Sequence, residues 1–128
     1  MSTPEKRLTK EDALAIHGAS LARFGGLPGL RDEGLLDSAL AQPFQTFGGE
    51  ELYPTLAEKA ARYAYGISRN RPFLDGNKRA ATACMATFLR LNGFRFRPRA
   101  DELLATMLGV AEGTVSYEEL AGWIARNL

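Results

Sequence analysis

Residues 71–79, Arg71-Pro72-Phe73-Leu74-Asp75-Gly76-Asn77-Lys78-Arg79, join two helical patterns and decide how the chain is organised. One carboxylate, one glycine, one amide and several cations gather where the second helix begins. The N–H groups at a helix start have no partners within the helix and carry the positive end of its dipole, so they favour an anion. The stretch therefore predicts a phosphate-binding loop.

Each polar residue of this stretch has an expected task. Gly76 allows the left-handed turn that brings a main chain close to a ligand, and Lys78 and Arg79 add formal charge. Asp75 is the only acid between Arg69 and Arg99, so it is the expected ligand for a Mg²⁺ ion that accompanies a nucleotide. Lys78 and Arg79 could instead belong to a solvated basic face with no ligand, but their position beside this turn favours a ligand-binding role. The stretch lacks a proton acceptor.

The two flanking patterns are helical. Upstream, Thr55 and Glu58 form a capping box. It leads a helix whose expected buried stripe is Leu56, Ala60, Tyr63, Ala64 and Ile67. Downstream, residues 80–91 are apolar around almost the whole circumference, which predicts a buried helix in the centre of a bundle.

Further from the motif, the pattern stays helical. Capping signals and apolar periodicity predict helices from Thr9 to Phe24, with a stripe of Leu14, Ala15, Leu21, Ala22 and Phe24, and after Asp32, Asp101 and Ser116. Residues 43–53 are expected to form an irregular aromatic loop, and residues 94–97 alternate as a strand does. The number of predicted helices and the near absence of strands predict an all-α bundle of about six helices, with a buried central helix after the motif loop.

Composition limits the class of protein. At 128 residues the chain is expected to form a single domain, residues 1–128. Its net charge is only +1, which argues against bulk nucleic-acid binding, and no apolar run is long enough to predict a membrane span. The polar first ten residues predict no export signal, and the lone Cys84 fits a reducing cytoplasm.

The charge is unevenly distributed along the chain. Residues 69–99 hold eight Lys or Arg against one acid. Seven basic residues against nine acids precede this segment (−2), and one against five follows it (−4). The positive charge is therefore concentrated on the motif and its flanks.

Residues 72–79 resemble the signature of the Fic/Doc superfamily, in which the loop reads His-x-Phe-x-Asp-(Gly/Ala)-Asn-Lys-Arg in the Doc (death-on-curing) toxin branch. The lysine at position 78 makes this stretch more similar to the Doc signature than to the Fic signature, whose usual run is Gly-Asn-Gly-Arg. Similar residues also occur at Ile16-His17, at Gly25-Gly26-Leu27-Pro28-Gly29, at Asn92-Gly93 and at Val115-Ser116. The likeness covers nearly the whole chain.

This resemblance implies a cytoplasmic toxin of a toxin–antitoxin module that uses ATP and Mg²⁺ to phosphorylate a threonine of elongation factor Tu, thereby blocking translation. It also implies a cognate antitoxin, with a peptide or helix segment bound in a groove, for which the aromatic loop from Phe44 to Phe47 and the apolar stripes of the first helices are the expected place. By the same likeness Asp75 is the metal-binding acid, Gly76 and Asn77 form the anion-binding turn, and Lys78 and Arg79 contact phosphate.

Arg71 departs from the family pattern, because it occupies the position of the catalytic histidine. That histidine accepts the proton of the attacking hydroxyl, whereas a guanidinium group has five donors, no acceptor and no accessible neutral form. Nucleotide binding is expected to survive and phosphoryl transfer to be nearly abolished. The only histidine, His17, lies on the first helix and is interpreted as structural.

Several alternatives stay open at the level of sequence. Arg71 is either an engineered or selected inactivating substitution, made because the active toxin kills its expression host, or a natural change in a protein that has lost catalysis and acts by binding. The active parent is either a Doc-type kinase or a Fic-type AMP transferase. A non-catalytic module that holds nucleotide or antitoxin is the third alternative.

Overall fold

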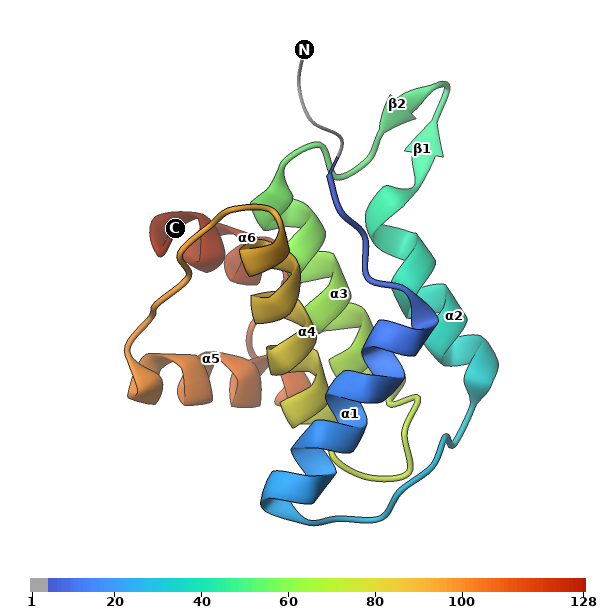
Figure 1. Ribbon diagram of the computed structural model, residues 1–128. Coiled ribbons are helices and arrows are strands. Elements are labelled where there is room, and N and C mark those ends of the chain that lie inside the picture. Colours follow the sequence, from blue (N-terminus) through green and yellow to red (C-terminus); the bar gives the residue numbers. More distant parts are fainter. Residues whose placement is uncertain (1–4) are drawn as a thin grey trace.

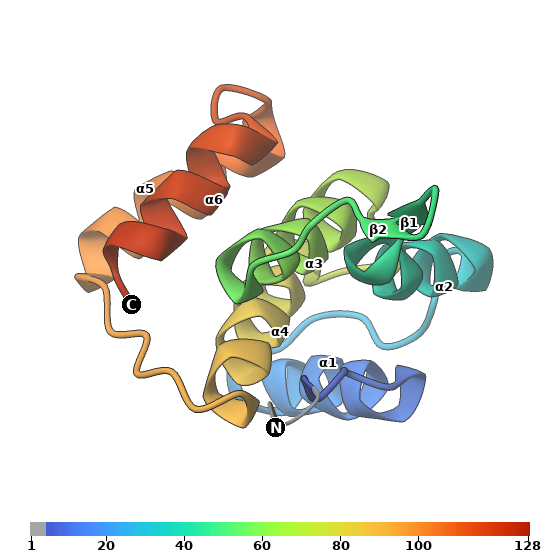
Figure 2. The same cartoon turned by 90° about the horizontal axis from the view of Figure 1, so that it is seen from above.

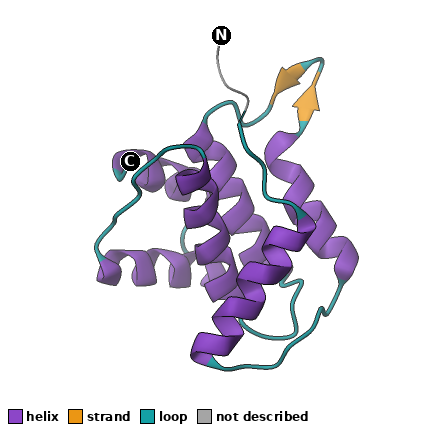
Figure 3. Cartoon of the chain, viewed as in Figure 1, coloured by secondary structure: helices purple, strands orange, loops and turns teal. Residues whose placement is uncertain are grey.

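The computed structural model describes residues 5–128, which form six α-helices, a short 3-10 helix and one two-stranded hairpin (Figures 1 and 3). In chain order these elements are α1 (Lys10–Phe24), α2 (Glu33–Ala41), η1 (Gln42–Phe44), β1 (Thr46–Phe47), β2 (Glu50–Glu51), α3 (Leu56–Asn70), α4 (Asn77–Leu91), α5 (Ala100–Glu112) and α6 (Tyr117–Arg126). The all-α bundle predicted from the sequence is therefore confirmed.

Helices α3 and α4 are the central pair. They pack against each other, with α1 on the free side of α4 and with α2, α5 and α6 around α3 (Figure 2). Of the residues 80–91 predicted to form a buried helix, those from 80 to 89 are buried or half-buried, whereas Arg90 and Leu91 are exposed at the end of α4. Helix α3 is equally enclosed, which the sequence indicates less clearly because Lys59, Arg62 and Ser68 interrupt its apolar pattern. The motif loop joins the two most deeply packed helices.

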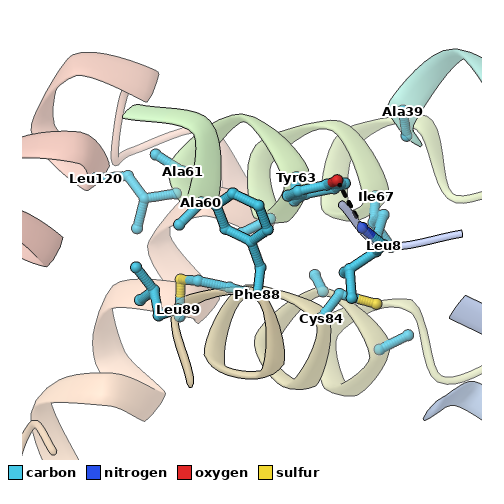
Figure 4. Packing of buried hydrophobic residues seen from close by; sticks show 14 of the residues in the cluster. Leu8, Ala39, Ala60, Ala61, Tyr63, Ile67, Cys84, Phe88, Leu89 and Leu120 are labelled. Atoms are coloured by element: carbon cyan, nitrogen blue, oxygen red, sulfur yellow. Dashed lines mark hydrogen bonds between the residues drawn. The ribbon is translucent and has the colours of Figure 1, made fainter. Parts of the chain in front are cut away.

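Aromatic side chains fill the interface between these two helices. The ring of Phe88 on α4 is fully buried and lies 4.9 Å from that of Tyr63 on α3, with Phe44 edge-on to both. The Tyr63 hydroxyl accepts the Leu8 N–H at 3.1 Å, which ties the segment before α1 to the core (Figure 4). Burial raises the pKa of Tyr63 to about 12, so the hydroxyl stays protonated.

The helix caps match the sequence signals at most starts. The reciprocal capping boxes Thr9–Asp12 and Ser116–Glu119 are both present, and Asp32 accepts the Leu35 N–H. At α3 the box is incomplete: the Thr55 hydroxyl accepts the Glu58 N–H, but the Glu58 carboxylate accepts the hydroxyl proton of Thr55 instead of its main-chain N–H. Only one orphan donor is satisfied there.

Three local predictions are wrong. In α1 the fully buried positions are Ala13 and His17, while Leu14 and Phe24 of the predicted stripe are exposed, because α1 lies at the edge of the bundle and turns a narrow face to α4. Residues 94–97 alternate inward and outward as expected, but they pair with no strand in the described chain. The only strand pair there is the hairpin of residues 46–51, within the loop predicted to be irregular.

None of the helices in residues 5–128 combines the length and apolar character needed to cross a bilayer.

Replacing Phe88 with alanine tests the central interface. We expect Phe88→Ala to lower the free energy of unfolding by about 3–5 kcal/mol, because it removes a buried ring and leaves a cavity. Phe47→Ala is the matched control: that ring is 81% exposed in the hairpin, so its loss should change stability by less than about 0.5 kcal/mol. Urea denaturation measures both. Similar costs for the two variants would contradict the assignment of Phe88 to the core.

Candidate functional site

The motif loop runs from the last residue of α3 to the first turn of α4 and lies against the connection between α1 and α2. The Leu74 N–H donates to the Gly29 carbonyl at 3.1 Å, and the Arg31 and Asp32 N–H groups both donate to the Pro72 carbonyl. Two segments about forty residues apart are thus joined by main-chain hydrogen bonds. These hydrogen bonds fix the motif loop against the connection between α1 and α2.

Asn77 holds the loop closed from inside. Its side-chain amide accepts the Phe73 N–H at 2.9 Å and donates to the Phe73 carbonyl at 3.0 Å, so one side chain satisfies both main-chain groups of one residue. The Phe73 ring is itself buried in the core. The amide predicted to bind phosphate is therefore engaged within the loop, and a ligand at this residue meets its main-chain N–H.

His17 supports the loop from below. Its ring stacks on that of Phe73, with centroids 3.8 Å apart and planes 9° from parallel, and its Nε2 atom lies 2.8 Å from the Asp75 carbonyl oxygen. Because a carbonyl oxygen only accepts, Nε2 must carry the proton. The ring is 4% exposed. This geometry agrees with the structural interpretation of His17.

Two glycines allow the close approach of main chains at the site. Gly76 is the N-cap of α4 with φ of 76°, a left-handed conformation that residues with a Cβ adopt at a cost. Gly26 has φ of 126°, and a Cβ added there would lie 2.8 Å from the Asp75 carboxylate. The glycine-rich turn after α1 is thus shaped around the aspartate.

Asp75 carries an ionised carboxylate at the surface. One of its oxygens accepts the Gly76 N–H at 2.8 Å and the other accepts the Leu27 N–H at 3.1 Å. Hydrogen bonds from Leu27 and then Gly76 lower the pKa of this exposed carboxyl, with a smaller contribution from the nearby Arg79 charge. The group is therefore an anion throughout the physiological pH range, as a metal ligand must be.

The start of α4 offers donors and charge together. The N–H groups of Asn77, Lys78 and Arg79 have no acceptor among residues 5–128. The side chains of Lys78 and Arg79 are exposed and form no ion pair in that range, although the Arg79 guanidinium lies 4.6 Å from the centroid of the Phe24 ring. An anion placed here meets both the helix dipole and two exposed cations.

Arg71 ends α3 in an unusual conformation. It is the C-cap residue and, within residues 5–128, the only non-glycine residue with positive φ (51°). Its side chain is exposed. The Arg31 guanidinium donates from Nε to the Arg71 carbonyl and from a terminal nitrogen to the Asn70 carbonyl, each at 2.7 Å. Arg31 therefore caps the carbonyl end of α3.

Sequence reasoning missed Arg31 and Leu27 as members of the site. Leu27 contributes only its main-chain N–H, and no local pattern distinguishes Arg31 from other surface arginines. The run of glycines at positions 25–29 was the available signal, because such a run favours close main-chain approach. The predicted residues from position 71 to position 79 do lie together, on one loop and one helix start.

Comparison with known proteins agrees with this geometry. A model of the Fic/DOC family matches residues 7–89, which include the motif loop, all of α3 and α4 up to residue 89. The chain is 41% identical over 102 residues to Toxin Doc of Mycolicibacterium smegmatis (strain ATCC 700084 / mc(2)155), covering 76% of each protein. It is 31% identical over 121 residues to Protein kinase doc of Escherichia phage P1, covering 94% of each.

Replacement of Asn77 tests whether its amide holds the loop. Asn77→Ala should lower the free energy of unfolding by about 1–3 kcal/mol, because two hydrogen bonds to the Phe73 main chain are lost. Thr82→Ala is the control on the same helix: its hydroxyl bonds only to the Lys78 carbonyl one turn back, and its loss should cost less than about 0.5 kcal/mol. Urea denaturation measures the free energy of unfolding of both variants. Equal losses would contradict the structural role of Asn77.

Proposed function

The chain belongs to the Fic/DOC family, and from that premise we propose that it is a Doc-type toxin of a toxin–antitoxin module. Its ancestral activity is the ATP-dependent phosphorylation of a threonine of elongation factor Tu in the cytoplasm, and Arg71 disables that transfer here. The observation that carries the proposal is the start of α4, where free N–H groups, Lys78, Arg79 and an ionised Asp75 meet on a rigid loop.

The residues present fit a magnesium nucleotide. Lys78, Arg79 and the main-chain N–H groups of residues 77–79 are suited to hold phosphate oxygens, as charge-assisted donors around an anion. Asp75 supplies the single carboxylate with which Mg²⁺ is commonly held beside substrate phosphates. Bound ATP with its Mg²⁺ provides the phosphoryl group and neutralises charge during transfer.

Arg71 lacks the chemistry that a general base needs. The attacking hydroxyl must lose its proton, a contribution of about 10²–10⁴ in rate, and a guanidinium group cannot take it. Phosphoryl transfer otherwise depends on positioning and charge, which this loop retains. The left-handed backbone at position 71 also suits histidine better than arginine, because histidine is enriched among non-glycine residues in that conformation. Restoring histidine should therefore leave the loop intact.

Arg71 equally favours a second function, a module that binds nucleotide or antitoxin without chemistry. A cleft of about 580 Å³ is lined by the segment before α1, by α2 and by η1, with Arg7, Leu40 and Phe44 among its walls. Residues 44–46 of the segment expected to receive the antitoxin line this cleft, whereas Phe47 does not, and an amphipathic helix or peptide with apolar anchors suits it. The antitoxin is then bound away from the motif loop.

Calorimetry with ATP and Mg²⁺ tests the nucleotide site. We expect measurable binding to the chain, and a loss of about tenfold or more in affinity for Lys78→Ala and for Arg79→Ala, because each removes a charge-assisted hydrogen bond. Arg90→Ala is the matched control: it removes the same charge at the opposite end of α4 and should leave the affinity unchanged. Equal affinities in all four proteins would end the nucleotide-site proposal.

Restoring the histidine tests the reaction. Arg71→His, mixed with elongation factor Tu, Mg²⁺ and ATP labelled on the γ-phosphate, should transfer label about 10²–10⁴ times faster than the chain with Arg71. Adding Asp75→Asn to this variant should abolish the gain. Transfer from ATP labelled on the α-phosphate instead would identify an AMP transferase. If Arg71→His binds ATP and transfers neither label, the binding function replaces the kinase.

A further inference from the structure

The second basic feature of the molecule lies at the other end of α4. A cleft of about 430 Å³, here termed the arginine cleft, is lined by Arg90, Gly93, Phe94, Arg95, Phe96 and Arg97. Helix α4 has 15 residues, so its C-terminal end lies about 22 Å from the motif loop at its N-terminus. A ligand in the arginine cleft therefore leaves the motif loop uncovered.

The cations of the arginine cleft are uncompensated. Arg90, Arg95 and Arg97 are exposed, and none of them forms an ion pair or donates a side-chain hydrogen bond within residues 5–128. Arg99, in the same connection, contrasts with them because its Nε atom and one terminal nitrogen donate to the two oxygens of the Asp101 carboxylate, at 3.1 and 2.8 Å. Three charges of one sign thus converge without a partner.

The main chain of the same segment is also unpartnered. Phe96 is buried edge-on against Trp123, and Phe94 packs half-buried against the core, so the intervening Arg95 and the following Arg97 point outward together. The main-chain groups of residues 95–97 make no hydrogen bond within the described chain. The core holds this segment extended, with free donors and acceptors and with arginines two residues apart.

These observations favour an acidic polypeptide over a nucleic acid. An added strand satisfies the free main-chain groups and places alternate carboxylates about 7 Å apart, which matches the spacing of Arg95 and Arg97. Single-stranded nucleic acid is bound by stacking bases on aromatic faces, and both phenylalanines of the cleft are turned into the protein. The overall charge of +1 also gives little non-specific attraction for a polyanion.

We propose that the arginine cleft is a docking site for an extended acidic segment of a partner protein. The segment adds as a strand along residues 94–97, and every second side chain offers a carboxylate to Arg95, Arg97 or Arg90. This site is independent of the nucleotide site and of the activity assigned to the motif loop.

Fluorescence anisotropy with a designed peptide tests the charge pattern. The probe is a short fluorescein-labelled peptide in which Glu and Val alternate, and the same peptide with Gln for Glu should not bind. Arg95→Ala and Arg97→Ala should each weaken binding about two- to fivefold, and the double variant about tenfold. Arg23→Ala, on the distant α1, removes one exposed charge and should have almost no effect. Equal weakening by all three single variants, or no binding, overturns the proposal.

Two further probes test the strand and the class of partner. Successive N–H groups of a strand point to opposite edges, so N-methylation of one alternate set should abolish binding and methylation of the other set should preserve it. Equal binding of both methylated peptides overturns strand addition. A labelled single-stranded oligonucleotide should bind more weakly than the peptide. If the oligonucleotide binds more tightly and its binding requires Arg95 and Arg97, the partner is a nucleic acid and the proposal of an acidic polypeptide is wrong.

Discussion

The double hydrogen bond between the Asn77 amide and the main chain of Phe73 is the constraint on which the candidate site depends. It closes the turn between α3 and α4 while the Phe73 ring enters the core and stacks on His17. Those two helices are the most enclosed elements of the bundle, so the loop has their rigidity. A binding loop so anchored presents its donors without first having to be ordered.

We propose that this loop binds an anion but lacks a general base at position 71. Asp75 is kept ionised by the Leu27 and Gly76 N–H groups, and free N–H groups and two cations lie at the start of α4. At position 71 the backbone is left-handed and the side chain is a permanent cation. On the proposed function, the same scaffold binds nucleotide and, with histidine at that position, also abstracts a proton. A single side chain separates the two functions proposed for the family member described here.

Helix α4 connects two positively charged regions of different kind. Its N-terminal end combines cations with free helix N–H groups, which suits phosphate. Its C-terminal end carries Arg90 and leads into residues 94–97, where Arg95 and Arg97 lie beside main-chain groups that have no partner in residues 5–128, which suits carboxylates spaced along a strand. The apolar middle of the helix separates them and gives each region a fixed position, so the two can be occupied independently.

Local signals in the sequence determined the helices and the motif, because caps such as Thr9–Asp12, apolar periodicity and the turn at Asp75-Gly76 act within a few residues. Only the tertiary structure decided which face of α1 is buried, that residues 94–97 pair with no strand in residues 5–128, and that Arg31 and Leu27 join the site. These features arise from contacts between segments far apart in the chain, and no local pattern encodes which segments will meet.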